Sequence, residues 1–171
     1  LDKIEVYGDG KGYGILLDGC YRFTAANLTA RDMEWQNATD PGSEQIVGIR
    51  CTDCLDGLLF NPQAHRLYGQ IASATAQPYQ TDGITCSGSE RLAFFSPRCS
   101  YVSEGMDFSG SGINKSLTIV GGRMYKTFSV GYKFTGAHRN HSIVGCIAEA
   151  CGLNGFTFNA GLAGTDGYTN L

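Results

Sequence analysis

Gly105-Met106-Asp107-Phe108-Ser109 is one copy of the five-residue pattern that decides the fold expected of this chain. The pattern is a glycine, a hydrophobic residue, any residue, a hydrophobic residue or cysteine, and a small polar residue. Six copies occur, at 14–18, 48–52, 83–87, 105–109, 131–135 and 155–159. Their glycines are 34, 35, 22, 26 and 24 residues apart, and a short motif repeated at such intervals is typical of a solenoid.

The motif is the length of a short β-strand. Alternation along a strand places its second and fourth residues on one face and its third and fifth on the other. Further strands are expected before the first copy, at 4–8, and between later copies, at 66–69, 117–121 and 142–145. We therefore predict one all-β domain over residues 1–171, a parallel β-helix of about six rungs. Its interior column should contain Ile49, Ile84, Met106 and Tyr132.

The composition excludes several classes of function. Charged residues make up 17 % of the chain and the net charge is −3, so no basic footprint for nucleic acid is expected. The sequence has no run of 18 or more apolar residues, so no membrane-spanning helix is expected. Because a solenoid needs capped ends, we expect the 171 residues to be a fragment of a longer chain.

The seven cysteines are an odd number, which excludes a complete set of intrachain disulfides. Cys51 and Cys86 occupy the fourth motif position, so we expect them to be stacked core thiols. Cys51 and Cys54 form a Cys-x-x-Cys pair without a second pair at matching spacing, and we predict neither a metal site nor a cofactor. This use of thiols favours assembly in a reducing compartment.

Asp82, Glu104 and Asp107 are the candidate catalytic residues. Asp82 and Glu104 each precede a motif glycine on adjacent rungs, and Asp107 follows Glu104 by three residues. Carboxyl groups about 5 Å apart suit a retaining glycosidase, whereas roughly 6.5–9.5 Å suits an inverting one. Close like charges raise one pKa and leave a proton donor beside an ionised partner. The alternative is structural: Asp82 and Glu104 cap turns, and Asp107 pairs with Lys133.

Five residues are candidates for substrate binding: Arg50, Lys133, Arg139, Trp35 and Tyr79. Arg50 and Lys133 occupy the outward third motif position, and the small polar fifth position runs beside it. Such ladders suit a repeating polar polymer, or equally a solvated sheet face. Trp35 and Tyr79 lie in or beside the long intervals at 36–45 and 72–81, where projecting loops are expected.

A lyase or epimerase acting on uronate sugars is a further alternative. It would need a cation to neutralise the sugar carboxylate and a base to remove a proton. Arg139 or Lys133 could supply the cation, and His138, His141 or a tyrosine the base. A solvated turn explains the same cluster at 138–141.

Two repeated features carry a resemblance to a known group of proteins. They are the six motif copies and the Ile-Val-Gly turns at 119–121 and 143–145. With them the chain resembles the right-handed parallel β-helix proteins of the pectate-lyase-like superfamily, and within these the phage tailspike and capsular depolymerase domains. The resemblance implies a homotrimer, although it is specific for the fold and not for an activity.

From these observations we expect a tailspike-like module that binds and hydrolyses a bacterial surface polysaccharide. Its location would be the phage virion after assembly in the bacterial cytoplasm, or otherwise extracellular. The alternatives are a non-catalytic glycan-binding or structural spike module and a uronate lyase or epimerase. The Asn-Thr-Asp, Gly-His-Gly and Arg-Ile-Lys motifs of polygalacturonases are absent from the sequence, which argues against pectin hydrolysis.

Overall fold

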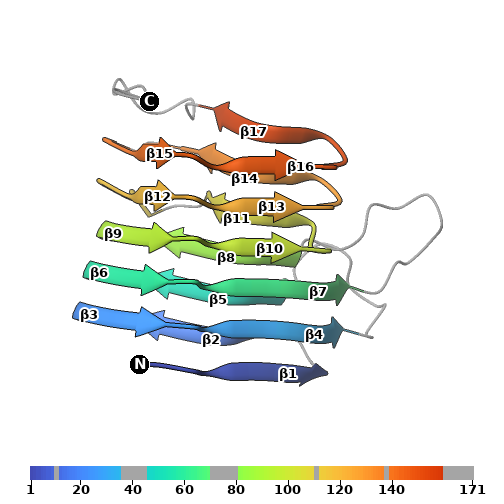
Figure 1. The fold of residues 1–171 in the computed structure, drawn as a ribbon. Coiled ribbons are helices and arrows are strands. Elements are labelled where there is room, and N and C mark those ends of the chain that lie inside the picture. The colour runs from blue at the N-terminus through green and yellow to red at the C-terminus, as the bar shows by residue number, and fades with distance from the viewer. Residues whose placement is uncertain (10–11, 36–45, 70–80, 110–111, 137–138, 160–171) are drawn as a thin grey trace.

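The computed structural model describes residues 1–9, 12–35, 46–69, 81–109, 112–136 and 139–159. Within these ranges the regular secondary structure consists of β-strands alone, and the strands form three parallel sheets (Figure 1). The all-β prediction is confirmed, and the arrangement is compatible with a parallel β-helix. No helix in the described ranges has the length and apolar character that crossing a membrane requires.

The three sheets are named here by their strands, in sequence order. The motif sheet holds β2 (Gly12–Asp18), β5 (Ile46–Thr52), β8 (Thr81–Ser87), β11 (Glu104–Phe108), β14 (Val130–Thr135) and β17 (Asn154–Asn159). The second sheet holds β3 (Tyr21–Ala26), β6 (Leu55–Phe60), β9 (Glu90–Phe95), β12 (Thr118–Val120) and β15 (Ser142–Val144). The third sheet holds β1 (Glu5–Asp9), β4 (Thr29–Trp35), β7 (Gln63–Gly69), β10 (Arg98–Ser100), β13 (Arg123–Tyr125) and β16 (Ile147–Glu149).

The chain visits the three sheets in a fixed order. After each of the first five motif strands it adds one strand to the second sheet and one to the third, and then returns to the motif sheet beside the previous motif strand. Figure 1 shows the resulting stack from β1 at one end to β17 at the other. The four further strands expected from the sequence are present, but β1 and β7 belong to the third sheet whereas β12 and β15 belong to the second.

The predicted interior column is confirmed. Ile49 pairs in register with Ile84, Ile84 with Met106, and Met106 with Tyr132, and all four side chains have 0 % exposure. Burial of such side chains stabilises the fold by roughly 1.5–3 kcal/mol each. Phe156 continues the column on β17, stacked on Tyr132 with ring centroids 4.8 Å apart.

The predicted pair of core thiols is also confirmed. Cys51 and Cys86 lie opposite each other in register and are buried. All seven cysteines are free thiols in the structure. Burial raises the pKa of Cys99, so this thiol stays protonated and unreactive.

The motif glycines are required by close packing between rungs. A Cβ atom on Gly105 would lie 2.5 Å from the carbonyl oxygen of Gly131 and 2.6 Å from Sδ of Met124. The same carbonyl contact recurs at 2.5–2.8 Å for the motif glycines of β2, β5, β8 and β14, and a contact below 3.0 Å forces something to move. Glycine is therefore the residue that lets the backbones of successive motif strands stack at this point.

We expect Gly105→Ala to lower the free energy of unfolding by about 3 kcal/mol, the upper end of the cost of overpacking, because a backbone carbonyl is in the way. Urea unfolding measures the loss. Gly155→Ala is the matched control, because a Cβ there meets only Cβ of Ala148 at 3.1 Å and a carbonyl oxygen at 4.0 Å. Equal losses in the two variants would contradict the packing argument.

Candidate functional site

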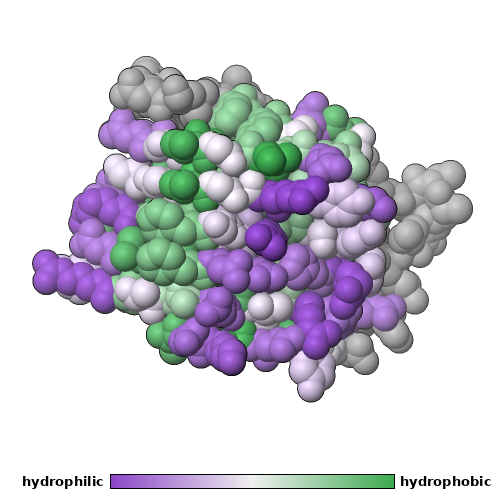
Figure 2. All heavy atoms as spheres, in the orientation of Figure 1, coloured by the Kyte–Doolittle hydropathy of each residue, from purple (hydrophilic) through white to green (hydrophobic). Residues whose placement is uncertain are grey.

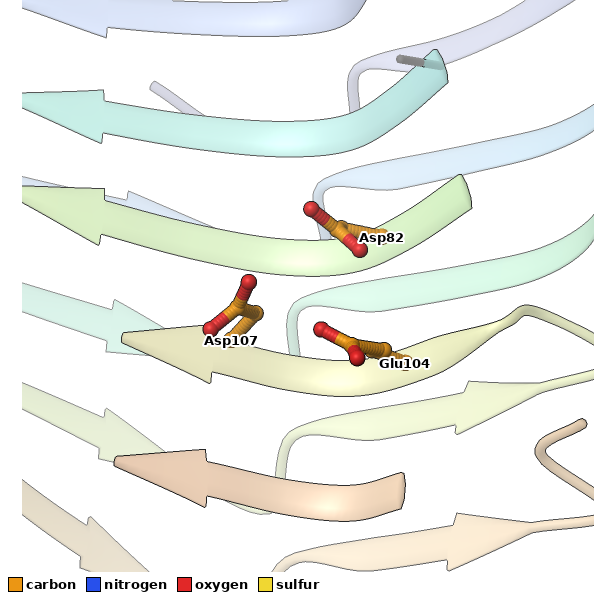
Figure 3. Close-up of side chains that lie close together, drawn as sticks. All are labelled: Asp82, Glu104 and Asp107. Carbon is orange, nitrogen blue, oxygen red and sulfur yellow. The ribbon is translucent and has the colours of Figure 1, made fainter. Parts of the chain in front are cut away.

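Three predicted carboxylates come together on the motif sheet. Asp82 on β8 and Glu104 on β11 are register partners, and Asp107 lies on the same strand as Glu104. Oxygen atoms of all three lie within 4.8 Å of one another. Figure 3 shows the three carboxyl groups converging from two adjacent strands. We call these residues the acid cluster.

The convergence arises at the motif glycine. Positions 105 and 106 both face the interior. A Cβ atom added to Gly105 would meet Met124, and the side chain of Met106 lies in the core. This breaks the alternation of the strand, so Glu104 and Asp107 both lie on the outer face. In Figure 3 the strands curve at this point, and Glu104 and Asp107 lie on the concave side.

The acid cluster is buried, which the outward position of its residues did not predict. Asp82, Glu104 and Asp107 are 1 %, 8 % and 3 % exposed. Val47, the register partner of Asp82 on β5, is itself fully buried and supplies an apolar neighbour.

Lys133 on β14 neutralises part of the charge. Its Nζ lies 2.8 Å from Oε2 of Glu104 and 3.6 Å from Oδ2 of Asp107. The predicted pairing of Asp107 with Lys133 across one rung is confirmed. Ser109 donates a hydrogen bond of 2.7 Å to Oδ2 of Asp107, and both contacts stabilise negative charge on Asp107.

The carboxyl groups differ in their tendency to hold a proton. Burial, together with the charges of Asp107 and Glu104, holds the pKa of Asp82 well above its usual range. Burial also raises the pKa of Glu104, although its hydrogen bond with Lys133 acts in the opposite direction. Burial alone would lower the pKa of Lys133, but the hydrogen bond to Glu104 and the nearby carboxylates outweigh it and raise that pKa.

Among the residues that the structure describes, two oxygens of the acid cluster are buried without a hydrogen-bond partner, Oδ1 of Asp82 and Oδ1 of Asp107. The hydroxyl oxygen of Thr85, the register partner of Asp107, is likewise buried and makes no hydrogen bond with a described residue. Unsatisfied buried oxygens are costly and are found where a proton, a ligand or an ion is to be accepted. Asp82, Glu104 and Asp107 are also the residues that could share a cation, although Lys133 already supplies one positive charge there.

The raised pKa of Asp82 predicts a specific dependence of stability on pH. Between the ordinary pKa of about 4 and the raised pKa, the folded protein holds one proton more than the unfolded chain. Stability is therefore lost as the pH rises through that interval. We expect Asp82→Asn, which is neutral at every pH, to melt at a higher temperature than the wild type at pH 8 and at nearly the same temperature at pH 4.

Thermal melting followed by circular dichroism from pH 4 to pH 8 tests this prediction. Asp18→Asn is the matched control, because Asp18 is an exposed carboxylate on β2 of the same sheet. An identical pH profile for Asp82→Asn and Asp18→Asn would show that Asp82 holds no extra proton in the folded protein.

Among the other predicted binding residues, Lys133 and Arg50 lie within electrostatic reach of Asp82, and their charges counteract the rise of its pKa. Arg50 lies two strands from Asp107 on the outer face, with its guanidinium 4.9 Å from the ring centroid of Tyr13. Lys133 is part of the ion network of the acid cluster. Arg139 is exposed, and its backbone forms an isolated β-bridge with that of Lys115. His141 is buried, and its Nδ1 accepts a hydrogen bond from the backbone amide of Leu117.

Several candidates lie outside the described residues. They are Tyr79, His138 and both predicted loop insertions, apart from Thr81, which begins β8. Trp35 is the last residue of β4, but its side chain is outside the described part of the protein.

The stacked motif placed Thr85 beside Asp107 in the third-position column and Ser109 in the fifth-position column, but sequence reasoning assigned neither residue to the acid cluster. A usable signal existed for Ser109, because a residue two positions after Asp107 lies on the same face of the strand. Comparisons of this chain with protein-family models, with curated proteins and with solved structures found no match.

Proposed function

We propose that this protein is a right-handed parallel β-helix of the tailspike type that binds and hydrolyses a bacterial surface polysaccharide. The observation that carries the proposal is the acid cluster, in which three buried carboxyl groups converge beside the ammonium of Lys133 and the pKa of one of them, Asp82, is raised. The cyclic order of the three parallel sheets supports the β-helix, in which side chains distant in sequence become neighbours.

The distances favour hydrolysis with retention of configuration. Oxygens within 4.8 Å of one another are nearer to the close carboxyl pair of retaining enzymes, about 5–5.5 Å apart, than to the wider pair of inverting enzymes. Asp82, protonated because its pKa is raised, is the acid that protonates the glycosidic oxygen. Asp107 is the nucleophile that bonds to the anomeric carbon as the leaving sugar departs.

The second half of the reaction returns both residues to their starting states. Asp82, now a carboxylate, takes a proton from water while the water oxygen attacks the anomeric carbon and releases Asp107. Glu104, held by Lys133 at 2.8 Å, keeps the ammonium beside Asp107 and acts as a positioning residue.

The proposal is tested by incubating the protein with a panel of bacterial capsular polysaccharides and lipopolysaccharides. We expect new reducing ends from one of them, and proton NMR should show that the first product keeps the anomeric configuration of the substrate. Ultraviolet absorbance from an unsaturated sugar would assign a lyase instead. Inverted product would remove the assignment of Asp107 as nucleophile.

A non-catalytic glycan-binding or structural module is the second candidate. It is supported by the burial of the acid cluster, whose three members are at most 8 % exposed. In that case Lys133, Glu104 and Asp107 form an internal ion network that ties β11 and β14 together. Polysaccharide binding without release of reducing ends would favour this candidate.

A homotrimer forms part of the proposal, as does a place in a phage tail. The second sheet carries an outward apolar column: Phe60, Phe95, Val120 and Val144 follow one another in register. Phe60 and Val144 are 40 % and 55 % exposed, and Figure 2 shows hydrophobic side chains gathered over this sheet. Covering such a column is a reason for a β-sheet protein to associate.

A further inference from the structure

A pocket of about 270 Å³ lies on the outer face of the third sheet, away from the acid cluster on the motif sheet. Three successive strands, β7, β10 and β13, line it. Its side chains come from two register columns. Arg98 lies opposite Arg123, and Ser100 lies between His65 and Tyr125.

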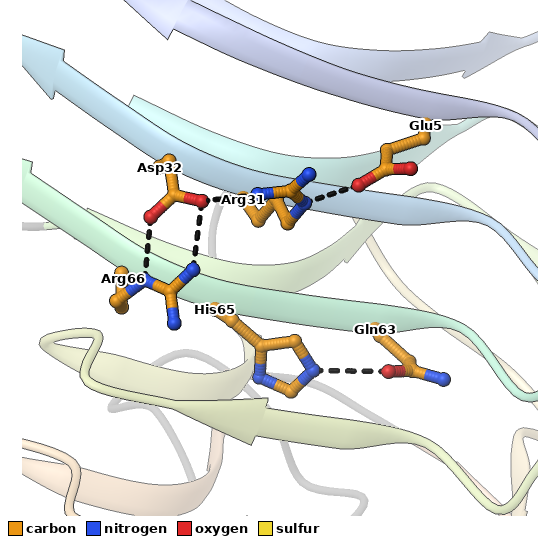
Figure 4. A network of polar contacts seen from close by, with 6 residues as sticks. All are labelled: Glu5, Arg31, Asp32, Gln63, His65 and Arg66. Carbon is orange, nitrogen blue, oxygen red and sulfur yellow. Dashed lines mark hydrogen bonds and ion pairs between the residues drawn. The ribbon is translucent and has the colours of Figure 1, made fainter.

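Arg98 differs from the other arginines of this sheet. Arg31 is paired with Glu5 and Asp32, Arg66 lies 2.5 Å from Asp32, and Arg123 lies 2.7 Å from Glu149 (the first two sets are drawn in Figure 4). Within the described part of the chain, Arg98 has no acidic partner. Its guanidinium therefore keeps five N–H donors for a ligand.

The position of Arg98 also favours an anion. Arg98 and Arg123 are direct register neighbours, and like charges placed opposite each other on adjacent strands destabilise a sheet. Glu149 offsets the charge of Arg123 alone. A carboxylate held by Arg98 would remove the remaining repulsion, and planar carboxylates suit the fork of a guanidinium.

His65 orients a hydroxyl in the pocket. Burial lowers the pKa of His65, with help from the charges of Arg66 and Arg98, so the ring is neutral at pH 7. Its Nε2 lies 3.0 Å from Oε1 of Gln63, which only accepts, so Nε2 carries the proton (Figure 4). The Nδ1 atom then accepts a hydrogen bond of 2.9 Å from Ser100, whose oxygen keeps its lone pairs for a ligand hydroxyl.

Tyr125 adds an apolar surface beside these polar groups. Its ring packs edge-on against Tyr101 with centroids 6.3 Å apart, and Lys126 lies 5.2 Å from its centroid. The pocket thus combines a cation, a hydroxyl acceptor and an aromatic ring. By liquid volume it holds roughly nine waters, which is room for one sugar residue.

We propose that this pocket is a second carbohydrate subsite, specific for a sugar that carries a carboxylate. Arg98 binds the carboxylate, Ser100 accepts a hydrogen bond from a ring hydroxyl, and Tyr125 packs against the sugar ring. The proposal shares with the proposed function only the assumption of a glycan partner. It does not require cleavage, because the subsite contains no member of the acid cluster.

NMR-detected titration of the folded protein with methyl β-D-glucuronide tests the subsite, and methyl β-D-glucoside is the same ring without the carboxylate. We expect saturable binding of the glucuronide and binding of the glucoside weaker by about tenfold or more, as for the loss of one charge-assisted hydrogen-bond pair. Arg98→Gln should weaken the glucuronide by about the same factor. Ser100→Ala should weaken it less.

Arg22→Gln is the matched control, because Arg22 is an exposed arginine beside a tyrosine ring, Tyr21, on the second sheet. It should bind the glucuronide as the wild type does, and so should Asp82→Asn. The proposal is overturned by equal binding of glucoside and glucuronide, by full binding in Arg98→Gln, or by inorganic phosphate binding as tightly as the glucuronide. Loss of binding in Asp82→Asn would also overturn it, since the ligand would then occupy the acid cluster.

Discussion

Asp82→Asn is expected to reduce glycan cleavage by about 10²–10⁴-fold, the usual contribution of a positioned acid–base group. An amide cannot donate the proton that the departing sugar oxygen needs. Asp82 is the second residue of β8 and is 1 % exposed, and an amide of nearly the same shape that carries no charge should leave the fold intact. The measurement is the initial rate of release of reducing ends from the polysaccharide that the wild type cleaves.

The same variant separates catalysis from folding. It should melt above the wild type at pH 8 while it loses activity, which a variant that merely unfolds would not do. Asp18→Asn should keep full activity, because Asp18 is an exposed carboxylate at the C-terminal end of β2. Wild-type turnover in Asp82→Asn would remove Asp82 from the mechanism, and the binding module would become the better interpretation.

Lys133→Met is expected to lower the free energy of unfolding by about 3 kcal/mol at pH 7. The substitution leaves Glu104 and Asp107, whose side chains are 10 % and 4 % exposed, without their cation. Breaking a buried ion pair from one side costs about 3–5 kcal/mol, and the lower end applies because the Lys133 side chain is itself 21 % exposed. Urea unfolding at several pH values measures the loss.

The pH dependence identifies the cause. Glu104 has a raised pKa, and losing the ammonium raises it further, so acidification protonates the stranded carboxylate and should shrink the loss. Lys115→Met is the matched control. Lys115 is 46 % exposed and 3.8 Å from Glu90, and such a surface pair contributes about 1 kcal/mol or less. A loss in Lys133→Met that stays constant down to pH 4 would point to lost packing of the lysine stem.

The repeat predicted the core correctly for a simple physical reason. Every second side chain of a strand faces the interior of the protein. A glycine marks the same point on each rung, so copies of the motif can stack in only one register. Ile49, Ile84 and Met106 therefore had to form a column. The pairing of Asp82 with Glu104 followed from the same rule, since each precedes a motif glycine.

Other features depend on three-dimensional contacts that the motif does not encode. The bend at Gly105 puts two consecutive positions inside and so brings Asp107 to the side of Glu104, within reach of Lys133. Burial of the acid cluster depends on neighbours such as Val47 that only the sheet makes adjacent. The division of the connecting strands between two sheets likewise depends on where each turn lies.

The sequence by itself determined the all-β class, the interior columns and the candidate acids, because strand alternation and repeat spacing act along the chain. Only the tertiary structure decided which charges are neutralised, because an ion pair depends on the side chains that neighbouring strands bring to it. Arg66 meets Asp32, whereas Arg98 meets the arginine of the next rung. That difference separates a structural ion pair from a residue that keeps its charge for a ligand.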